Sequence, residues 1–194
     1  MRILKSKKRL KKLYELKHSL LHGTIDRLLF QDECMIRDYQ AIFRTWFPKG
    51  KQRIVPTYGK HSGVKLIGVL DYETGEVVCI HSTSYDAQQF LAFLQLVLEK
   101  YPNQKVVMIL DNARIHHAKL LQPFLQQNKA VLKLVFLPPY SPQLNPIEKV
   151  WGWLKRTCIY NVFFKSVEEI ATAVFAFIKE INRTPIKTID RLCI

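Results

Sequence analysis

The segment that most constrains the fold is a short, almost wholly apolar run at residues 105–110 (KVVMIL), which is followed directly by Asp111. A run of this length and composition is typical of a central strand covered on both faces. It therefore favours an α/β domain. In an open α/β sheet, ligands bind at the carboxyl ends of parallel strands, and Asp111 lies at such an end. The alternative is that Asp111 only begins a turn, since Asp-Asn is a good turn pair.

The other hydrophobic patterns predict one mixed sheet with helices. A hairpin turn at 71–75 (DYETG) joins two of the early strands, and Asp86 and Ser166 are placed to cap two of the helices. The early hairpin indicates antiparallel strands, and the later alternation of strand and helix indicates parallel ones. The predicted strands are 27–33, 64–70, 76–81, 105–110 and 131–137, and the predicted helices are 84–101, 116–128, one from Asn145 and one from Ser166.

Residues 1–24 are predicted to be a basic, helical N-terminal extension of a single domain at 25–194, ended by Gly23. Up to Lys17 there are eight basic residues and one acidic residue, a charge of +7, which is half of the net charge of +14. Such a surplus indicates a polyanionic partner, with nucleic acid first and an acidic membrane surface second. No apolar run is long enough to span a membrane. The widely spaced cysteines favour reduced thiols in an intracellular protein.

Three carboxylates occupy positions suited to chemistry. Asp32 is expected to end the first strand and Asp111 follows the apolar strand, while Glu148 falls at the third position of a helix with Asn145 as N-cap and Pro146 as first residue. Glu148 has a structural alternative, because glutamate at that position also serves a capping box. Together, three converging carboxylates can hold two divalent cations such as Mg²⁺ or Mn²⁺, which suits phosphoryl transfer.

Three segments carry a family resemblance: LLFQDE (28–33), ILDNARIHHA (109–118) and LPPYSPQLNPIEKVWGWLK (137–155). They resemble the three motif blocks of DDE transposases, and most closely the bacterial insertion-sequence branch of the mariner superfamily, the IS six-thirty type. The third block is long and unusual and therefore highly specific, the second is fairly specific, and the first is weak alone. The resemblance extends from about Leu13 to the C-terminus.

The resemblance implies a ribonuclease H-like fold in which Asp32, Asp111 and Glu148 are the catalytic, metal-binding triad. Asp111 and Glu148 are 37 residues apart (148 minus 111), similar to the family pattern. Adjacent strand residues point to opposite faces, so Asp32 and Glu33 compete for the first position. The family match favours Asp32 and leaves Glu33 as a supporting or surface group.

Several polar residues of these blocks are candidates for supporting roles, in which they orient the acids or contact DNA. The alternative is a purely structural role at a turn, a cap or a helix start, and for Asn145 this alternative is favoured. Trp151 is expected mainly to pack in the core. The supporting residues are Glu33, Asn112, His116 and Asn145.

The activity that the resemblance implies is metal-dependent cleavage of double-stranded DNA at transposon ends, followed by strand transfer into target DNA by a homodimer in the bacterial cytoplasm and nucleoid. TA dinucleotide targets are part of the same implication. Full-length family members carry an N-terminal helix-turn-helix region with no counterpart before Arg27, so we expect either a truncated chain or a separately encoded helix-turn-helix partner or reading frame. Two alternatives remain: a catalytically silent, truncated transposase that acts as a DNA-binding inhibitor, and a cellular ribonuclease H-like nuclease.

Overall fold

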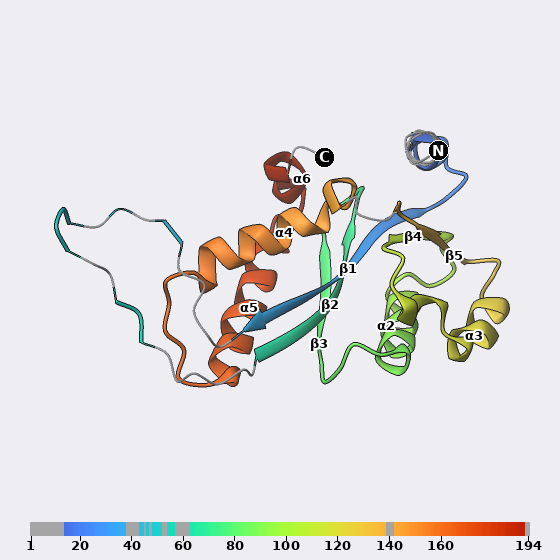
Figure 1. The fold of residues 1–194 in the computed structure, drawn as a ribbon. Helices are drawn as coiled ribbons and strands as arrows, with labels where there is room; N and C mark the ends of the chain where they lie inside the picture. The colour runs from blue at the N-terminus through green and yellow to red at the C-terminus, as the bar shows by residue number, and fades with distance from the viewer. Residues whose placement is uncertain are drawn as a thin grey trace, which may run out of the picture.

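A computed structural model of the chain describes residues 14–37, 43–44, 46, 48–51, 54–56, 63–138 and 142–192. Its centre is a five-stranded sheet in the order β3-β2-β1-β4-β5 (Figure 1). The strands are β1 (Arg27–Arg37), β2 (Gly63–Asp71), β3 (Val77–Ser82), β4 (Val106–Leu110) and β5 (Leu132–Phe136).

The strand directions confirm the predicted fold class. β2 lies between β1 and β3 and runs antiparallel to both, whereas β4 runs parallel to β1 and β5 runs parallel to β4. All five residues of β4 are buried, as its apolar sequence predicted for a central strand. The result is a ribonuclease H-like mixed sheet of three antiparallel and two parallel strands.

β1 is longer than the sequence predicted, so the expectation that Asp32 ends the first strand was wrong. β2 pairs with β1 from Leu29 to Arg37, and this antiparallel ladder keeps the chain extended beyond Asp32. β4 pairs with β1 only as far as Phe30. Asp32 therefore lies where β1 loses its parallel neighbour rather than where β1 stops.

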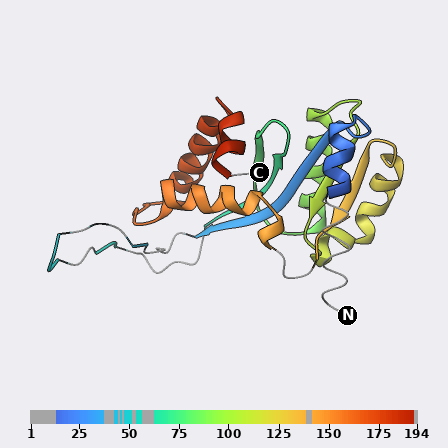
Figure 2. The same cartoon turned by 90° about the horizontal axis from the view of Figure 1, so that it is seen from above.

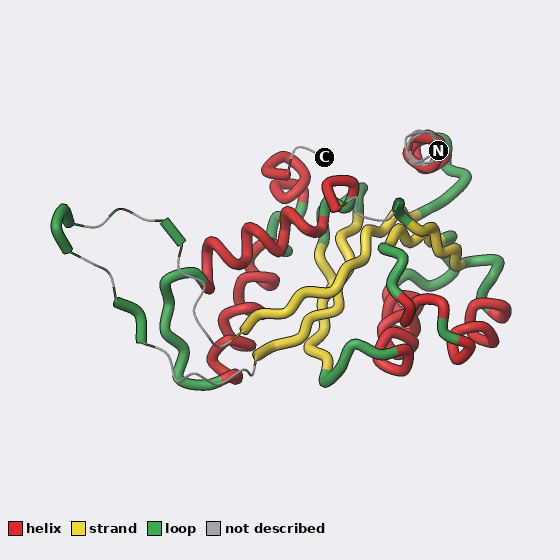
Figure 3. Tube along the Cα trace, in the orientation of Figure 1, coloured by secondary structure: helices red, strands yellow, loops and turns green. Residues whose placement is uncertain are grey.

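Helices cover both faces of the sheet, as Figures 2 and 3 show. On one face, α4 (Ile147–Leu154) and α5 (Val167–Ile181) enclose a core that includes Phe30 and Leu66. On the other face, α2 (Ala87–Lys100) encloses a second core. The remaining helical elements are η1 (Arg114–His117), η2 (Lys119–Leu121), α3 (Gln122–Gln127), η3 (Pro142–Leu144), the π-helical turn η4 (Lys155–Ile159) and α6 (Ile186–Leu192).

Two predicted helix starts are confirmed by their caps. The Asp86 carboxylate accepts hydrogen bonds from the backbone N–H groups of Gln88 and Gln89 at the start of α2. The Ser166 hydroxyl accepts from the backbone N–H of Glu169 at the start of α5. Both side chains satisfy N–H groups that have no partner within the helix.

The continuous helix predicted at 116–128 was wrong. Two short 3₁₀ turns, η1 and η2, precede the six-residue α3. Between the turns, Ala118 has an extended backbone (φ −61°, ψ 141°), which interrupts the helical path. Residues 139–141, which belong to the third motif block, lie outside the described part of the chain.

The N-terminal extension is helical over 14–21, and Gly23 follows it with a φ of +67°. Leu16 is buried in the core beside α4 and α5. Lys17 lies 4.4 Å from the ring centre of Tyr72, in a cation–π contact. Residues 1–13, which carry most of the predicted basic helix, are outside the described residues. Within the described part of the chain, none of the helices has the length and apolar composition that a membrane crossing requires.

The β2–β3 hairpin is fixed by Asp71, which is 1% exposed. Its carboxylate accepts from the backbone N–H groups of Glu73 and Thr74 and from the Arg27 guanidinium. Gly75 completes the turn with a φ of +78°. This turn lies against the start of α6, because the backbone of Gly75 closely approaches the Pro185 carbonyl.

Candidate active site

The strand register brings the first two predicted acids to the same point of the sheet. Phe30 on β1 is paired with Ile109 on β4 in parallel register. Continuing this register by two residues sets Asp32 beside Asp111. The position lies at the carboxyl end of β4, where α/β sheets bind their ligands.

Asp32 is half-buried in a negatively charged environment. Burial raises the pKa of Asp32 to about 8, and the nearby charges of Glu148, Glu33 and Asp111 add to the rise. A hydrogen bond from the Glu33 backbone opposes that rise. Both other predicted acids of the triad, Glu148 and Asp111, therefore act electrostatically on Asp32. Such a cluster favours a bound cation, because a cation relieves the repulsion that otherwise keeps a proton on the site.

The third acid is positioned by a hydrogen bond from its own helix segment to β1. Asn145 is buried, and its side-chain N–H donates to the backbone carbonyl oxygen of Gln31 at 2.8 Å. The prediction that Asn145 caps the helix with its side chain was wrong, since Pro146 occupies the cap position of α4 without a side-chain bond. The Asn145 side chain makes the hydrogen bond to β1 instead. This bond ties Asn145, two residues before α4, to Gln31, the residue before Asp32.

Glu33 faces the opposite side of β1 from Asp32 and contacts a buried histidine. The His116 side chain is 0% exposed, and its two ring nitrogens face different carboxylates. Nε2 lies 3.1 Å from Glu33 Oε1, and Nδ1 lies 3.2 Å from Asp111 Oδ1. Gln31 also donates to Glu33 Oε1 at 3.0 Å. His116 thus links Glu33 on β1 to Asp111 after β4, while its ring packs on Phe90.

Among the described residues, the acidic and histidine side chains that gather most closely are Glu33, Asp111 and His116, whose ligand atoms lie within 4.8 Å of one another. Such a group could hold a metal ion, and the two nitrogens of His116 also point to two separate carboxylates. The geometry is that of a bridge between carboxylates. Asp111 remains 56% exposed and keeps its other oxygen for a further partner.

Two contacts at the site were not predicted from the sequence. The Trp151 indole N–H donates to Asp32 Oδ2 at 3.1 Å, although the sequence indicated mainly core packing for this residue. The exposed Asn112 lies 2.8 Å from Nε2 of His117 rather than on Asp111. The available signal for Trp151 was Gly68, a glycine inside an apolar strand, which indicates close approach by another group.

A mixed sheet in this strand order, with carboxylates gathered where β1 and β4 separate, is the architecture of ribonuclease H-like enzymes. Comparison with known families and structures agrees. The family model for DDE superfamily endonucleases matches residues 27–171, which contain all three acids. The chain therefore belongs to the DDE superfamily endonucleases.

Relatives and solved structures connect the chain to insertion elements and mariner transposases. An insertion element IS630 protein of 39 kDa from Shigella sonnei, of uncharacterised activity, is 27% identical over 87% of this chain and 51% of its own length. An uncharacterised protein of Sinorhizobium fredii is 39% identical over 34% of this chain and 45% of its own length. The chain spans about half the length of these curated relatives. The predicted resemblance to the insertion-sequence branch of the mariner superfamily is confirmed.

The fold comparisons agree with this family. The Mos1 mariner paired-end complex with Mn matches with a TM-score of 0.67 at 18% identity, over 98% of this chain and 58% of that one. The catalytic domain of Mos1 mariner transposase matches with a TM-score of 0.56 at 13% identity, over 96% of this chain and 92% of that one. At these identities the likeness concerns the fold.

Proposed function

We propose that this chain is the catalytic domain of a transposase that cleaves DNA at transposon ends and joins the freed end to target DNA. The proposal rests on a convergence of Asp111, after β4, and Glu148, of α4, on Asp32 of β1, since both acids raise the pKa of Asp32. The register of β1 and β4 and the raised pKa of Asp32 both support this convergence. Membership of the DDE endonuclease family supports the same reaction.

The donor set fits divalent cations such as Mg²⁺ or Mn²⁺, since all three side chains offer hard oxygen ligands. In the proposal, Asp32, Asp111 and Glu148 hold two such ions. Ions of this kind supply activation of the attacking oxygen and stabilisation of the leaving oxygen in an in-line displacement. One structural neighbour is a Mos1 complex with Mn and another is a Mos1 complex with Mg.

The chain's own residues orient this donor set. Trp151 binds one oxygen of Asp32, His116 binds one oxygen of Asp111, and Asn145 fixes the start of the helix that carries Glu148. Phosphoryl transfer of this kind depends mainly on positioning and charge stabilisation. A net charge of +14 favours binding of the DNA backbone through its phosphates.

The assembly is part of the same proposal. We infer a homodimer acting on double-stranded DNA at the bacterial nucleoid, with end recognition supplied by a helix-turn-helix region, protein or reading frame. The support is the family resemblance and the structural neighbours, which include a Mos1 paired-end complex with the left transposon end.

The test is cleavage of supercoiled plasmid by the full chain with Mg²⁺ or Mn²⁺. We expect Asp32→Asn, Asp111→Asn and Glu148→Gln each to abolish nicking, and Glu99→Gln on the exposed side of α2 to nick like the wild type. Joining of a 3′-hydroxyl oligonucleotide to plasmid DNA then tests strand transfer. Wild-type nicking by Asp32→Asn or Asp111→Asn would overturn the proposal. Cleavage confined to RNA–DNA hybrids would indicate a cellular nuclease, and DNA binding without any nicking would indicate a silent inhibitor.

A further inference from the structure

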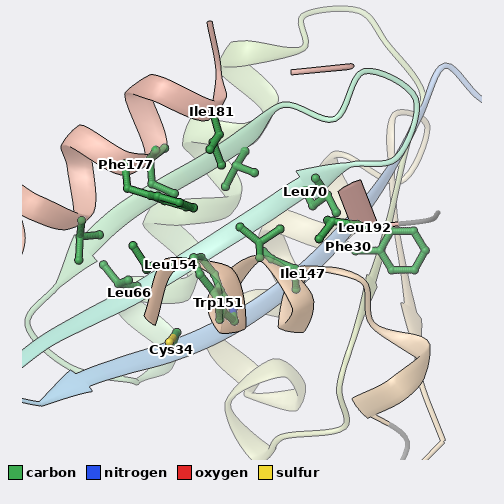
Figure 4. Packing of buried hydrophobic residues seen from close by; sticks show 14 of the residues in the cluster. Phe30, Cys34, Leu66, Leu70, Ile147, Trp151, Leu154, Phe177, Ile181 and Leu192 are labelled. Carbon is green, nitrogen blue, oxygen red and sulfur yellow. The ribbon is translucent and has the colours of Figure 1, made fainter. Parts of the chain in front are cut away.

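Trp151 is the feature of the site that core packing alone does not explain. The side chain is 2% exposed and belongs to the core between the sheet and α4, and Figure 4 shows it on the helix where α4 crosses the strands. Indole has a single polar group, an N–H that only donates. In Trp151 that N–H donates to Asp32 Oδ2 at 3.1 Å.

The sheet provides a space for this ring directly opposite Asp32. Gly68 on β2 is the register partner of Asp32. A Cβ added at Gly68 would lie 2.8 Å from Cη2 of Trp151, closer than real Cβ contacts, and 3.0 Å from Cζ2, tighter than most of them. The absence of a side chain at Gly68 is therefore what lets the indole reach the carboxylate.

The helix that carries this donor also carries the third acid. Trp151 follows Glu148 by three residues, so the two side chains lie on neighbouring positions of one helix face. Glu148 is the charged neighbour with the largest effect on Asp32. One helix thus brings both a negative charge and a hydrogen-bond donor to Asp32.

We propose that Trp151 is a positioning residue for the metal site: its indole N–H holds Oδ2 of Asp32 and leaves Oδ1 as the metal ligand, with Gly68 keeping the space for the ring. The inference rests on the proposed function, because it assumes that Asp32 binds a cation. Carboxylates that bind metals are commonly oriented by such hydrogen bonds, and losing one typically costs about ten- to hundred-fold in metal affinity or activity.

The first experiment reads the hydrogen bond itself. The chain has three tryptophans, so an indole ¹⁵N–¹H spectrum gives three signals that single Trp→Phe variants assign. We expect Asp32→Asn to move the Trp151 signal, because the substitution changes the group that accepts the indole hydrogen bond. Added Mg²⁺ should move it as well. The Trp153 signal should stay in place, since that ring packs on Phe177 and Arg191. A Trp151 signal that is identical in wild type and Asp32→Asn would overturn the inference.

The second experiment measures Mn²⁺ affinity of the full chain by calorimetry. We expect Trp151→Phe, which keeps an aromatic ring but removes the N–H, to weaken binding about ten-fold. Gly68→Ala should act in the same direction by displacing the ring. Trp153→Phe is the matched control on the same helix and should bind Mn²⁺ like the wild type. Thermal unfolding of each variant identifies any that fail to fold. The spectrum of Asp32→Asn tests the hydrogen bond independently, because Trp151 itself is not substituted in that variant.

The outcomes separate this inference from the proposed function. Unchanged Mn²⁺ affinity in a folded Trp151→Phe, with Asp32→Asn inactive on plasmid, would overturn the positioning role and leave the transposase proposal standing. Full activity of Asp32→Asn would overturn the proposed function and the inference with it.

Discussion

Asp32 and Glu33 are adjacent in sequence, yet their carboxylates serve opposite faces of β1. Asp32 accepts from the indole of Trp151, whereas Glu33 lies against the buried ring of His116. The strand alternation makes this separation unavoidable, because successive side chains point to opposite sides of a sheet. One carboxylate joins the acids proposed to bind metal, and the other supports Asp111 through His116.

Removal of the His116 bridge is expected to impair catalysis. His116→Ala leaves Asp111 Oδ1 and Glu33 without their shared partner, so we expect plasmid nicking to slow about ten- to hundred-fold. The measurement is the initial rate of nicking at saturating Mn²⁺. The control is His117→Ala, the neighbouring exposed histidine, which contacts Asn112 instead. Equal rates for the two variants would show that the bridge has no part in the reaction.

The stability of the metal-free protein should depend on the charge state of Asp32. Its pKa is about 8 in the folded protein, well above that of an ordinary aspartate, so the folded state holds the proton more tightly than the unfolded state. The resulting contribution to stability is complete below the ordinary aspartate pKa of about 3.9 and is lost as the pH rises toward 8. We expect the Tm without metal to fall over that range, and less steeply in Asp32→Asn. Parallel profiles for Asp32→Asn and wild type would contradict the raised pKa, and Glu99→Gln should follow the wild type.

Loss of the Asn145 side chain should destabilise the start of α4. Asn145→Ala leaves the buried carbonyl oxygen of Gln31 without its donor, which typically costs about 1–3 kcal/mol. Chemical denaturation measures this cost as a lower free energy of unfolding. Gln143→Ala, an exposed change in the same segment, provides the control and should unfold like the wild type. An unchanged free energy in Asn145→Ala would mean that water replaces the lost donor.

The hairpin turn offers a test of close packing against α6. Gly75 and Gly50 have nearly equal φ values, +78° and +79°, so alanine strains the backbone similarly at both. At Gly75 the new Cβ would also overlap the Pro185 carbonyl, whereas at Gly50 it meets no described atom within 4 Å. We expect Gly75→Ala to lower the free energy of unfolding by about 1–3 kcal/mol more than Gly50→Ala. Equal losses would show that α6 moves away at little cost.

Local patterns predicted the elements that depend on nearby residues. The caps at Asp86 and Ser166 follow from side chains a few positions away, and β4 follows from its uninterrupted apolar run. The continuation of β1 past Asp32 depends on β2, a distant segment that supplies the pairing. The polar residues Gln31, Asp32 and Glu33 interrupt the apolar pattern there, so the pattern alone did not predict the rest of the strand.

The site was predicted unevenly for the same reason. The positions of Asp111 after β4 and of Glu148 in α4 follow from local order, and the opposite facing of Asp32 and Glu33 follows from strand alternation. The triad's role as metal ligands stays a prediction. The bond from Asn145 to Gln31 and that from Trp151 to Asp32 join segments more than a hundred residues apart, and only the fold shows them.

The segment from Asn145 to Trp151 has a consequence for how this site can evolve. Asn145 at one end donates a hydrogen bond to Gln31 of β1, Trp151 at the other end donates one to Asp32, and Glu148 lies between them. A substitution that tilts or shifts this segment alters the bond to Gln31, the bond to Asp32 and the position of Glu148 at once. The positions of Asp32 and Glu148 therefore cannot change independently. Under the proposed function, variation that adapts the protein to new DNA ends is therefore easier to accommodate in elements that do not touch this segment.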